Sequence, residues 1–576
     1  MSEERVCEKN DELIIDIIDI GTEGEGIGRI DGYTLFVKDA VIGDRVRVKV
    51  IKTKKRFGYA RLMEIIKPSV WRVEPVCDVA RQCGGCQLQH FSYKKQLEWK
   101  QQKVLDCLER IGGFDVQDIM EPIMGMDEPF HYRNKAQFPV GYDKKGNLVT
   151  GFYAGRTHSI IPCMDCEIQH PVNSVILRAV LEYMNENNVP AYNEKDGSGL
   201  VRHILTRVGM VTGDVMVCLI INGKTIPHKE RLIEKLLACD FTHVSDNDNK
   251  DVDKEGKLLT KKPFQIKSVS LNINMKNTNV ILGDKVDTIY GNPYIEDYIG
   301  DIKYRISPLS FYQVNPLQTK KLYETALEYA DLKGGEVVWD LYCGIGTISL
   351  FLAQKAAKVC GVEIVPQAIE DAKNNAKLNG MTNTEFFVGA AEDVVPKKYA
   401  ESDGMLKADV VTIDPPRKGC DEKLLQTVIK MQPKKIVYVS CDPATLARDL
   451  KYLAGNGYRL ERVRACDMFG HSFHVETVVL LSQRKADDYV EVELELDELD
   501  ITSAETKATY REIQQYVMKQ TGMIVSDLNI AQVRRKCGLD MRENYNLPKS
   551  ENAKQPKCPE KKEKAIVEAV KYYQMK

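Results

Sequence analysis

The sequence predicts a multidomain protein with an N-terminal β-barrel, a central α+β domain, a Rossmann-like α/β domain and a helical tail. Three observations support this fold class: short strands punctuated by glycines, a group of cysteines after them, and strand–helix alternation from about residue 307. The expected domains span residues 1–68, 69–300, 301–486 and 501–576. A chain of 576 residues is too long for one hydrophobic core, which agrees with several domains.

The composition limits the classes of partner. The net charge of −2 excludes a global positive field, so any contact with nucleic acid must come from local patches. We expect no membrane partner because no stretch of about 18 residues is continuously apolar. The charged segment Met1–Asp11 lacks the apolar centre of a secretion signal. We therefore expect a monomer in the cytoplasm.

The N-terminal residues 12–66 have the rhythm of a small five-stranded barrel. Leu13–Ile20, Thr34–Val37 and Arg45–Ile51 are predicted strands, and glycines separate them. Barrels of this size often bind single-stranded nucleic acid. The segment from Lys49 to Tyr59 mixes cations with aromatic residues. That mixture fits either an RNA-binding strip or the solvated edge of a hairpin.

Cysteines cluster after the barrel, in a chain with 16 of them. Cys77, Cys83 and Cys86 lie in one turn-rich stretch, and Cys163 or Cys166 could supply a fourth thiolate. Four thiolates suit either zinc or an iron–sulfur cluster, although paired two-residue spacings would favour zinc. In a cytosolic chain such a group indicates metal binding or catalysis rather than disulfides.

The middle of the chain predicts a helix followed by a mixed sheet. Apolar positions over Tyr93–Arg110 have helical spacing, and this helix could pack on the catalytic domain. Residues 130–300 resemble a mixed sheet, interrupted by a polar loop over Ser245–Lys262. Candidate RNA contacts, which could equally be surface charges, are Arg133, Asn134, Lys135, Arg202 and His203.

Strands and helices alternate through the third domain, as in a doubly wound α/β fold. The predicted helices include Thr347–Ala357 and Pro366–Asn379. The predicted strands are Val337–Leu341, Lys358–Glu363, Thr384–Val388, Val410–Ile413, Lys435–Ser440 and Val475–Leu481.

A glycine-containing turn in this domain predicts a nucleotide-type cofactor site. Asp340–Thr347 follows a strand and opens a helix, and its glycines let a ligand approach the backbone closely. Glu363 closes the next strand, where a carboxylate could bind a ribose. This spacing permits NAD, flavin or S-adenosylmethionine. Asp340 and the tetrapeptide Asp414–Arg417, similar to a class I methyltransferase motif, favour the last.

Cys441 is a candidate nucleophile because it ends a buried-type strand, where open α/β sheets place their chemistry. Asp442 can cap the next helix, whose N-terminus would stabilise a thiolate. Glu476 begins the last strand and would have a raised pKa if desolvated, which suits a general base. A buried structural thiol and an exposed strand-end glutamate are the alternatives.

These elements together resemble the RNA uracil-5-methyltransferase family, in the branch with a TRAM barrel and an iron–sulfur cluster. The resemblance covers roughly residues 10–485. The matching elements are Gln313, Asp340–Gly346, Glu363, Asp414–Gly419, Ser440–Asp449 and His474–Glu476. One departure is Gly470, where many relatives have proline after the phenylalanine.

The resemblance implies a site and two cofactors. Cys441 would be the nucleophile and Glu476 the base, while S-adenosylmethionine would be the methyl donor. A four-iron four-sulfur cluster would be held by Cys77, Cys83, Cys86 and Cys166. The cofactor and uracil pocket would be formed by Gln313, Tyr342, Gly344, Gly346, Glu363 and Asp414.

The same resemblance implies 23S ribosomal RNA as substrate, because the transfer-RNA branch usually lacks both barrel and cluster. Other interpretations are transfer-RNA uridine methylation, cytosine-5 methylation, amino-group methylation, and a non-catalytic iron–sulfur RNA-binding protein. Cytosine-5 enzymes often carry a second cysteine near the Pro-Pro motif, whereas Cys420 lies six residues beyond Asp414.

The tail predicts helices over Thr506–Gln520 and Lys561–Tyr573. Residues 501–576 contain 15 Lys and Arg against 9 Asp and Glu. The basic segment Asn529–Gly538 could contact RNA or form a solvated helix face. Cys537 and Cys558 lack metal-like partners, so we expect no second metal site.

Overall fold

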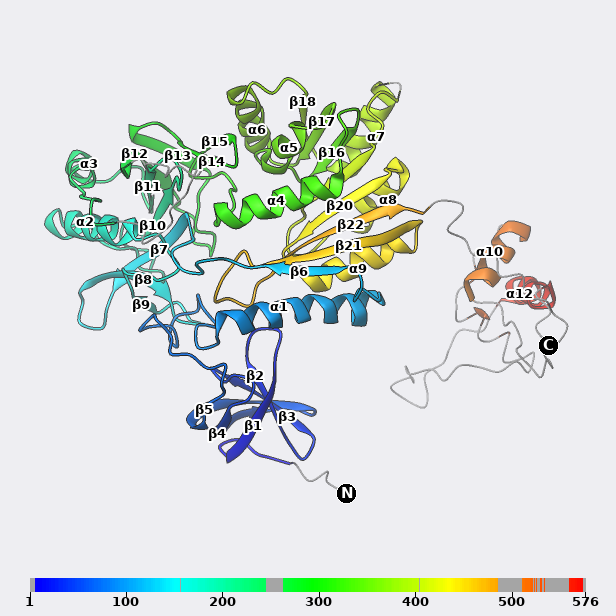
Figure 1. The fold of residues 1–576 in the computed structure, drawn as a ribbon, viewed down its shortest axis with the longest axis horizontal. Coiled ribbons are helices and arrows are strands. Elements are labelled where there is room, and N and C mark those ends of the chain that lie inside the picture. The colour runs from blue at the N-terminus through cyan, green and yellow to red at the C-terminus, as the bar shows by residue number, and fades with distance from the viewer. Residues whose placement is uncertain are drawn as a thin grey trace. The chain divides into compact units, whose positions relative to one another are not determined.

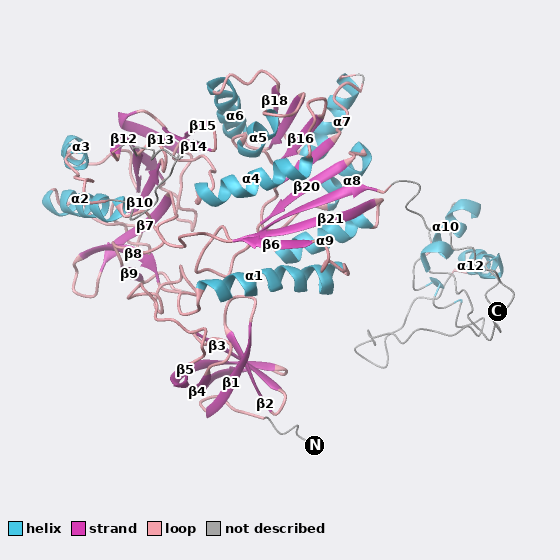
Figure 2. Cartoon of the chain, in the orientation of Figure 1, coloured by secondary structure: helices cyan, strands magenta, loops and turns pink. Residues whose placement is uncertain are grey.

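The structure is a computed structural model, shown by chain order in Figure 1 and by secondary structure in Figure 2. It divides into two compact units, Met1–Ala486 and Asp487–Lys576. The described residues are 6–155, 157–244, 263–402, 404–484, 510–521, 523, 525, 529–530, 533 and 559–572.

Five strands form a closed barrel at the N-terminus, in the order β1-β2-β3-β5-β4 (Figure 1). Their bounds are β1 Glu12–Ile20, β2 Gly26–Ile30, β3 Tyr33–Lys38, β4 Arg45–Thr53 and β5 Phe57–Lys67. Alternate residues such as Val37 and Val48 fill the interior. A Cβ at Gly28 would lie 2.7 Å from the Ile15 side chain, so the close strand packing requires glycine there. The predicted five-stranded barrel is confirmed.

The central domain is a seven-stranded sheet with helices α2 and α3, in the order β13-β12-β11-β10-β7-β8-β9. Its helices are α2 Val172–Glu186 and α3 Lys229–Leu237. Its strands are β7 Lys135–Tyr142, β8 Leu148–Tyr153, β9 Ile160–Pro162, β10 Val201–Val208, β11 Asp214–Ile221, β12 Gln265–Ile273 and β13 Lys285–Gly291. The predicted loop Ser245–Lys262 lies outside the described residues.

An eight-stranded sheet forms the core of the third domain, in the order β18-β17-β16-β19-β20-β22-β21-β6. Its strands are β6 Met120–Met124, β16 Val337–Leu341, β17 Lys358–Glu363, β18 Thr384–Val388, β19 Val410–Ile413, β20 Lys435–Ser440, β21 Tyr458–Cys466 and β22 Glu476–Gln483. Helices flank the sheet: α4 Pro316–Ala330, α5 Thr347–Ala353, α6 Pro366–Leu378, α7 Ala391–Glu401, α8 Glu422–Met431 and α9 Pro443–Ala454. The hairpin β14 Ile295–Ile299 and β15 Ile302–Ile306 precedes α4.

The predicted helix over Tyr93–Arg110 belongs in space to this third domain. Helix α1 spans Tyr93–Cys107, continues as a π-helical turn over Leu108–Gly112, and packs on α9. Strand β6 then adds to the sheet in parallel with β21 (Figure 2). The chain therefore contributes to the eight-stranded sheet both before and after it builds the central domain.

The tail holds helices α10 (Tyr510–Thr521) and α12 (Glu560–Tyr572), close to the two predicted ranges. Their apolar sides share a small core that includes Ile513, Val517 and Ile566. Most of the predicted segment Asn529–Gly538, with Cys537 and Cys558, lies outside the described residues. In the described part of the chain, no helix is long and apolar enough to cross a membrane.

Candidate active site

The sheet register brings the predicted catalytic residues to one edge of the sheet. Strands β16, β19 and β20 run parallel, whereas β22 pairs antiparallel with β20 and places Ser440 opposite Thr477. The residue after Ser440 and the residue before Thr477 therefore lie at the same edge. These residues are Cys441 and Glu476, and Tyr342 and Asp414 follow the neighbouring strands. Open α/β sheets bind ligands at this edge.

The glycine turn after β16 has the conformation that its sequence predicts. Gly344 and Gly346 have φ values of 55° and 82°, in the region that favours glycine. The Glu363 carboxylate accepts hydrogen bonds from the amides of Gly344 at 3.3 Å and Val365 at 3.0 Å. Tyr342 also has a positive φ of 66°. The turn before α5 thus has a constrained backbone and the Glu363 carboxylate beside it. A helix N-terminus with these features suits the binding of a cofactor.

Two aspartates lie behind this turn. Asp340 is buried and accepts hydrogen bonds from Thr412 at 2.9 Å and from Ser349. Burial raises the pKa of Asp340 to about 6. Burial, and then the Asp340 charge, raise the pKa of Asp414 to about 7. Asp414 can therefore be held protonated or ionised near neutral pH.

Cys441 follows β20 directly and precedes a well-capped helix. The Asp442 carboxylate accepts hydrogen bonds from the amides of Ala444 and Thr445, and Pro443 is the first residue of α9. Burial raises the pKa of the Cys441 thiol to about 12, and the charges of Glu476 and Asp414 act in the same direction. This direction is opposite to the one expected from the helix N-terminus beside Cys441, because burial favours the neutral thiol in the free protein.

Glu476 is the buried first residue of β22, with 4% of its surface exposed. Burial, and then the Asp414 charge, raise the pKa of Glu476 to about 8. This confirms the pKa direction expected for a desolvated carboxyl group. At neutral pH the free protein thus holds a neutral thiol beside a largely protonated carboxyl group.

Arg417 is a residue whose role the sequence interpretation missed. Its charge lowers the pKa values of Cys441 and Glu476, so the guanidinium lies within electrostatic range of both. It is exposed, which leaves it accessible to an anionic ligand. The position of Arg417 in the Asp414–Arg417 motif could have identified it from the sequence. His474, in the same region, has a pKa lowered to about 4 by burial and by Arg417.

Gln313 lies in the loop before α4 and is 7% exposed. The amide side chain of Asn134 donates to the Gln313 carbonyl at 3.0 Å, and the Asn134 backbone amide donates to the Val314 carbonyl at 2.9 Å. Asn134 is thus a support for this loop rather than an exposed RNA contact.

Two further candidate RNA contacts are also buried. The Arg202 guanidinium donates to the carbonyls of Asn274 at 3.0 Å and Lys276 at 2.8 Å, and His203 is 6% exposed. Both expectations, RNA contact and surface charge, are wrong for these residues. The strand β10 that carries them is buried along its whole length, which the sequence alone did not reveal.

The loop between β21 and β22 is fixed from α1. The Lys100 ammonium contacts the Asp467 carboxylate at 2.6 Å with both side chains fully buried, and it also donates to the Phe469 carbonyl at 3.0 Å. Gln96 donates to the Leu88 and Phe91 carbonyls and accepts from the His471 amide. These contacts hold the segment that ends at Glu476.

The same loop contacts the cysteine segment. The amides of Gln87 and Leu88, just after Cys86, both donate to the His471 carbonyl at 2.9 Å. The chain thereby joins the cysteine segment to the β21–β22 loop. Gly470 replaces the proline of many relatives, and its carbonyl accepts a hydrogen bond from the Tyr132 hydroxyl at 3.1 Å.

The predicted cysteine ligands lie in one region of the chain. Cys77 and Cys166 lie close enough to Cys163 to raise the pKa of its thiol, and the Gly85 amide donates to the Cys83 sulfur at 3.3 Å. Cys86 lies within electrostatic range of Cys77, Cys83 and Cys166. Among the described residues, however, no three His, Cys, Asp or Glu side chains are arranged as a metal site. The four predicted cysteines have the donor atoms that an iron–sulfur cluster needs, but their side chains are not arranged around a common metal position.

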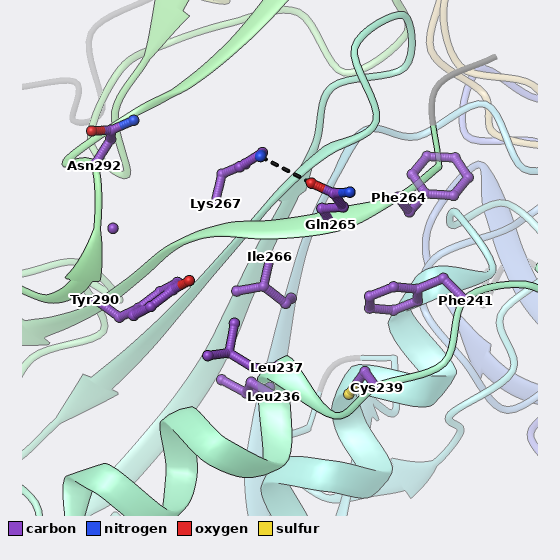
Figure 3. A pocket seen from close by; sticks show the side chains of 11 residues that line it. Leu236, Leu237, Cys239, Phe241, Phe264, Gln265, Ile266, Lys267, Tyr290 and Asn292 are labelled. Atoms are coloured by element: carbon purple, nitrogen blue, oxygen red, sulfur yellow. Dashed lines mark hydrogen bonds between the residues drawn. The ribbon is translucent and has the colours of Figure 1, made fainter. Parts of the chain in front are cut away.

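A separate pocket of about 440 Å³ lies in the central domain (Figure 3). Phe241 and Phe264 border it near Cys239, with Tyr290 and Asn292 farther along. Lys267 crosses its rim and donates to Gln265 at 2.9 Å. None of the predicted catalytic, cofactor or cysteine residues lines this pocket.

Comparisons with known proteins agree with this architecture. Residues 243–484 match the tRNA (Uracil-5-)-methyltransferase family, and residues 8–63 match the TRAM domain. A relative from Halalkalibacterium halodurans, named as an uncharacterized RNA methyltransferase, is 49% identical over 82% of this chain and 97% of its own. A Clostridium tetani protein of the same name is 48% identical over 84% and 98%.

A solved structure has a similar fold. The Pyrococcus abyssi tRNA (uracil-54, C5)-methyltransferase, in complex with S-adenosyl-L-homocysteine, aligns with a TM-score of 0.62 and 27% identity. The alignment covers 81% of this chain and 99% of the archaeal one.

Proposed function

The chain belongs to the S-adenosylmethionine-dependent RNA uracil-5-methyltransferase family, and from this premise we propose that it methylates carbon 5 of a uridine through a covalent bond to Cys441. The observation that carries the proposal is the register of β20 and β22, which sets Cys441 beside Glu476. A nucleophile and a base at one sheet edge are what this reaction needs.

The reaction follows from the weak nucleophilicity of carbon 5 in uracil. The Cys441 thiol loses its proton to solvent, and the resulting thiolate adds to carbon 6, which makes carbon 5 nucleophilic as part of an enolate. Carbon 5 then attacks the methyl group of the sulfonium, and S-adenosylhomocysteine leaves. The Glu476 carboxylate removes the carbon 5 proton, the ring double bond re-forms, and the sulfur departs.

In our proposal, nearby charged groups favour the ionised forms of Cys441 and Glu476. Arg417 lowers the pKa values of both Cys441 and Glu476, so it favours the ionised forms that the chemistry uses. The positive sulfonium of the methyl donor would act in the same sense when bound. In this proposal Glu363, which lies beside the Gly344–Gly346 turn, would accept hydrogen bonds from the ribose of the donor. Gln313, Tyr342 and Asp414 would form the walls around the donor and the uracil.

RNA containing 5-fluorouridine tests the mechanism. Fluorine replaces the proton that Glu476 would remove, so the enzyme should stay bonded to the methylated ring. We expect a complex that survives denaturing electrophoresis, requires S-adenosylmethionine, and maps to Cys441 by mass spectrometry. The Cys441→Ser variant should bind S-adenosylmethionine and form no such complex. A wild-type protein that methylates RNA without this adduct would contradict the mechanism.

We propose 23S ribosomal RNA as the substrate, acted on in the cytoplasm. The support is the barrel together with the cysteine segment, a combination that the resemblance associates with ribosomal substrates. Transfer RNA is the second candidate, because the Pyrococcus abyssi neighbour is named as a transfer-RNA enzyme. Mapping 5-methyluridine in both RNA classes with and without the gene decides between them. Loss of 5-methylcytidine instead would indicate cytosine-5 methylation.

We also propose that Cys77, Cys83, Cys86 and Cys166 hold a four-iron four-sulfur cluster with a structural role. The support is the donor set and the link from Gln87 and Leu88 to the β21–β22 loop. Protein purified without oxygen should contain about four iron and four sulfide per chain. The Cys166→Ser variant should lose them, whereas Cys163→Ser should keep them. The reverse pattern would assign the fourth ligand to Cys163.

A further inference from the structure

The loop that follows β19 is fixed to helix α9, the helix that begins just after Cys441. This loop spans residues 414–420 and carries Arg417. Its backbone turns sharply at Gly419, whose φ is 73° and whose amide donates to the Pro416 carbonyl at 2.8 Å. The contacts that fix the shape of this loop therefore also fix the backbone position of Arg417.

Asp449 on α9 is the buried centre of the contact between the loop and the helix. Its side chain is fully buried, and its Oδ2 atom accepts hydrogen bonds from the Cys420 amide at 2.8 Å and the Tyr438 hydroxyl at 2.7 Å. Tyr438 belongs to β20, the strand that leads to Cys441. The Asp449 carboxylate thus connects the end of the loop to the strand that presents the proposed nucleophile.

Arg448, the residue before Asp449, binds the backbone of the loop. Its guanidinium donates to Asp449 Oδ1 through Nε at 2.8 Å and through Nη2 at 2.7 Å. The Nη2 atom also donates to the carbonyls of Lys418 and Cys420, both at 3.1 Å. Arg448 therefore holds the chain on both sides of Gly419, while its positive charge compensates the buried carboxylate.

The fit between the loop and α9 leaves no room for a side chain at Gly419. A Cβ there would lie 2.6 Å from Arg448 Nη2 and 2.6 Å from Asp449 Oδ2. The positive φ of this residue also favours glycine. In the first turn of α9, the Thr445 hydroxyl donates to the Arg417 carbonyl at 3.3 Å. Glycine thus allows the loop to lie directly against the helix.

Arg417 is the cation whose position depends on this contact. The charged groups that act on the Cys441 thiol are Glu476 on β22, Asp414 and Arg417 in the loop, and the adjacent Asp442. Of these four groups, only Arg417 is positive, and its charge lowers the pKa of the thiol. A displaced Arg417 would leave the thiol facing three carboxyl groups, so the thiolate would be harder to form.

We propose that Asp449 and Arg448 are positioning residues, which hold the Arg417 guanidinium beside the thiol and the carboxyl group of the active site. This inference rests on the proposed function and deepens it, because it assigns a role to the last two residues of the Ser440–Asp449 motif. Both side chains act on the backbone of the loop and not on the substrate. When their contact with the loop is broken, the charge of Arg417 no longer favours the thiolate.

Two variants of the full-length protein break the contact, and a third is the matched control. Arg448→Gln removes a side chain that is 53% exposed, so the fold does not depend on its burial, and Asp449→Asn keeps the shape of the buried side chain without its charge. The control is Arg459→Gln, because Arg459 is 54% exposed and pairs with Glu461 at 2.9 Å. It lies at the end of β21 that pairs with Ser482, opposite the active-site edge. Calorimetry with S-adenosylmethionine and thermal unfolding verify that each variant remains folded.

Alkylation of Cys441 by iodoacetamide measures the effect, because the thiolate is the reactive form and the reagent carries no charge. Mass spectrometry quantifies the modified peptide at one mildly alkaline pH. Arg448→Gln and Asp449→Asn should slow alkylation roughly threefold to tenfold, because a higher thiol pKa lowers the thiolate fraction in proportion. They should slow formation of the 5-fluorouridine adduct by a similar factor, with unchanged affinity for S-adenosylmethionine. Arg459→Gln should leave both rates unchanged.

The Arg417→Gln variant separates positioning from a direct effect of the changed charges. On its own it should slow alkylation of Cys441 at least as much as Arg448→Gln does. Adding Arg448→Gln to it should cause little further change, since the guanidinium that the loop positions is already absent. A pair that acted directly on the thiol, or only on stability, would have the same effect in both backgrounds.

Alkylation at the wild-type rate in both Arg448→Gln and Asp449→Asn would overturn the proposal. So would an effect of Arg448→Gln that is equal with and without Arg417, or an Arg417→Gln variant that reacts like the wild type. Failure of the proposed function has a different signature. In that case the wild type would form no 5-fluorouridine adduct, whereas alkylation of Cys441 would still show whether the pair positions Arg417.

Discussion

At the scale of single residues, burial determines the protonation of the catalytic pair. Burial raises the pKa of Glu476 from 4.5 to about 8, so the folded protein retains a proton that the unfolded chain releases. Wild-type stability should therefore fall as the pH rises from 4.5 to 8 and then level off. The Glu476→Gln variant lacks this contribution. Between pH 4.5 and pH 8, its free energy of unfolding relative to that of the wild type should therefore increase by roughly 2 kcal/mol or more.

Urea denaturation of both proteins at several pH values measures this difference. If the stability of the two proteins changed with pH in the same way, Glu476 would have an ordinary pKa in the folded state. The proposed raised pKa of its carboxyl group would then be wrong. The same variant should accumulate the Cys441–uracil adduct with ordinary uridine, since no base removes the carbon 5 proton. A variant with normal turnover would exclude Glu476 as the base.

Motif residues could be predicted from the sequence, whereas their electrostatics could not. The position of Cys441 after a strand and the capping role of Asp442 are local properties, and both were predicted correctly. The raised pKa of the Cys441 thiol depends first on burial and then on Glu476 and Asp414, which belong to other parts of the sheet. Arg202 and His203 failed for the same reason, because the sequence does not show which strands are covered on both faces.

At the scale of elements, α1 holds the loop that presents Glu476. Replacing Lys100 by Met would leave the Asp467 carboxylate buried without its cation. We expect Lys100→Met to lower the free energy of unfolding by about 3–5 kcal/mol. The double variant Lys100→Met with Asp467→Leu should recover part of that loss, because neither charge is then buried alone.

The same helix supplies a control. Lys95 and Glu98 form an exposed pair at 2.6 Å, so Glu98→Gln should change stability far less than Lys100→Met does. Chemical denaturation measures all three variants. A Lys100→Met protein as stable as Glu98→Gln would mean that solvent reaches Asp467 and that the buried pair does not fix the loop.

Strand boundaries illustrate what periodicity reveals at this scale. Five of the predicted strands, from Val337–Leu341 to Lys435–Ser440, have the predicted bounds because each is a short apolar run between turns. Strands β6 and β21 were not predicted. For β6 the reason is that its partner strand lies more than 300 residues away. Pairing over such separations leaves no local signal.

At the scale of the whole molecule, the two compact units should fold independently. The relatives from Halalkalibacterium halodurans and Clostridium tetani align over 97% and 98% of their own length. These alignments cover 82% and 84% of this chain. The tail helices have a core of their own, built from residues such as Ile513, Val517 and Ile566. Residues 1–486 should therefore retain the barrel, both sheets and the binding of S-adenosylmethionine without residues 487–576.

A protein truncated after Ala486 tests this independence. Its main thermal transition should lie within about 2 °C of the full-length value, because no strand of the first unit is removed. The matched control ends after His474 and so removes β22. That strand lies between β20 and β21, so its loss exposes two inner strands and should abolish cooperative unfolding. If truncation after Ala486 also abolished cooperative unfolding, the tail would be part of the catalytic unit's core. The truncated protein should form the 5-fluorouridine adduct with short RNA, since both Cys441 and Glu476 precede the cut.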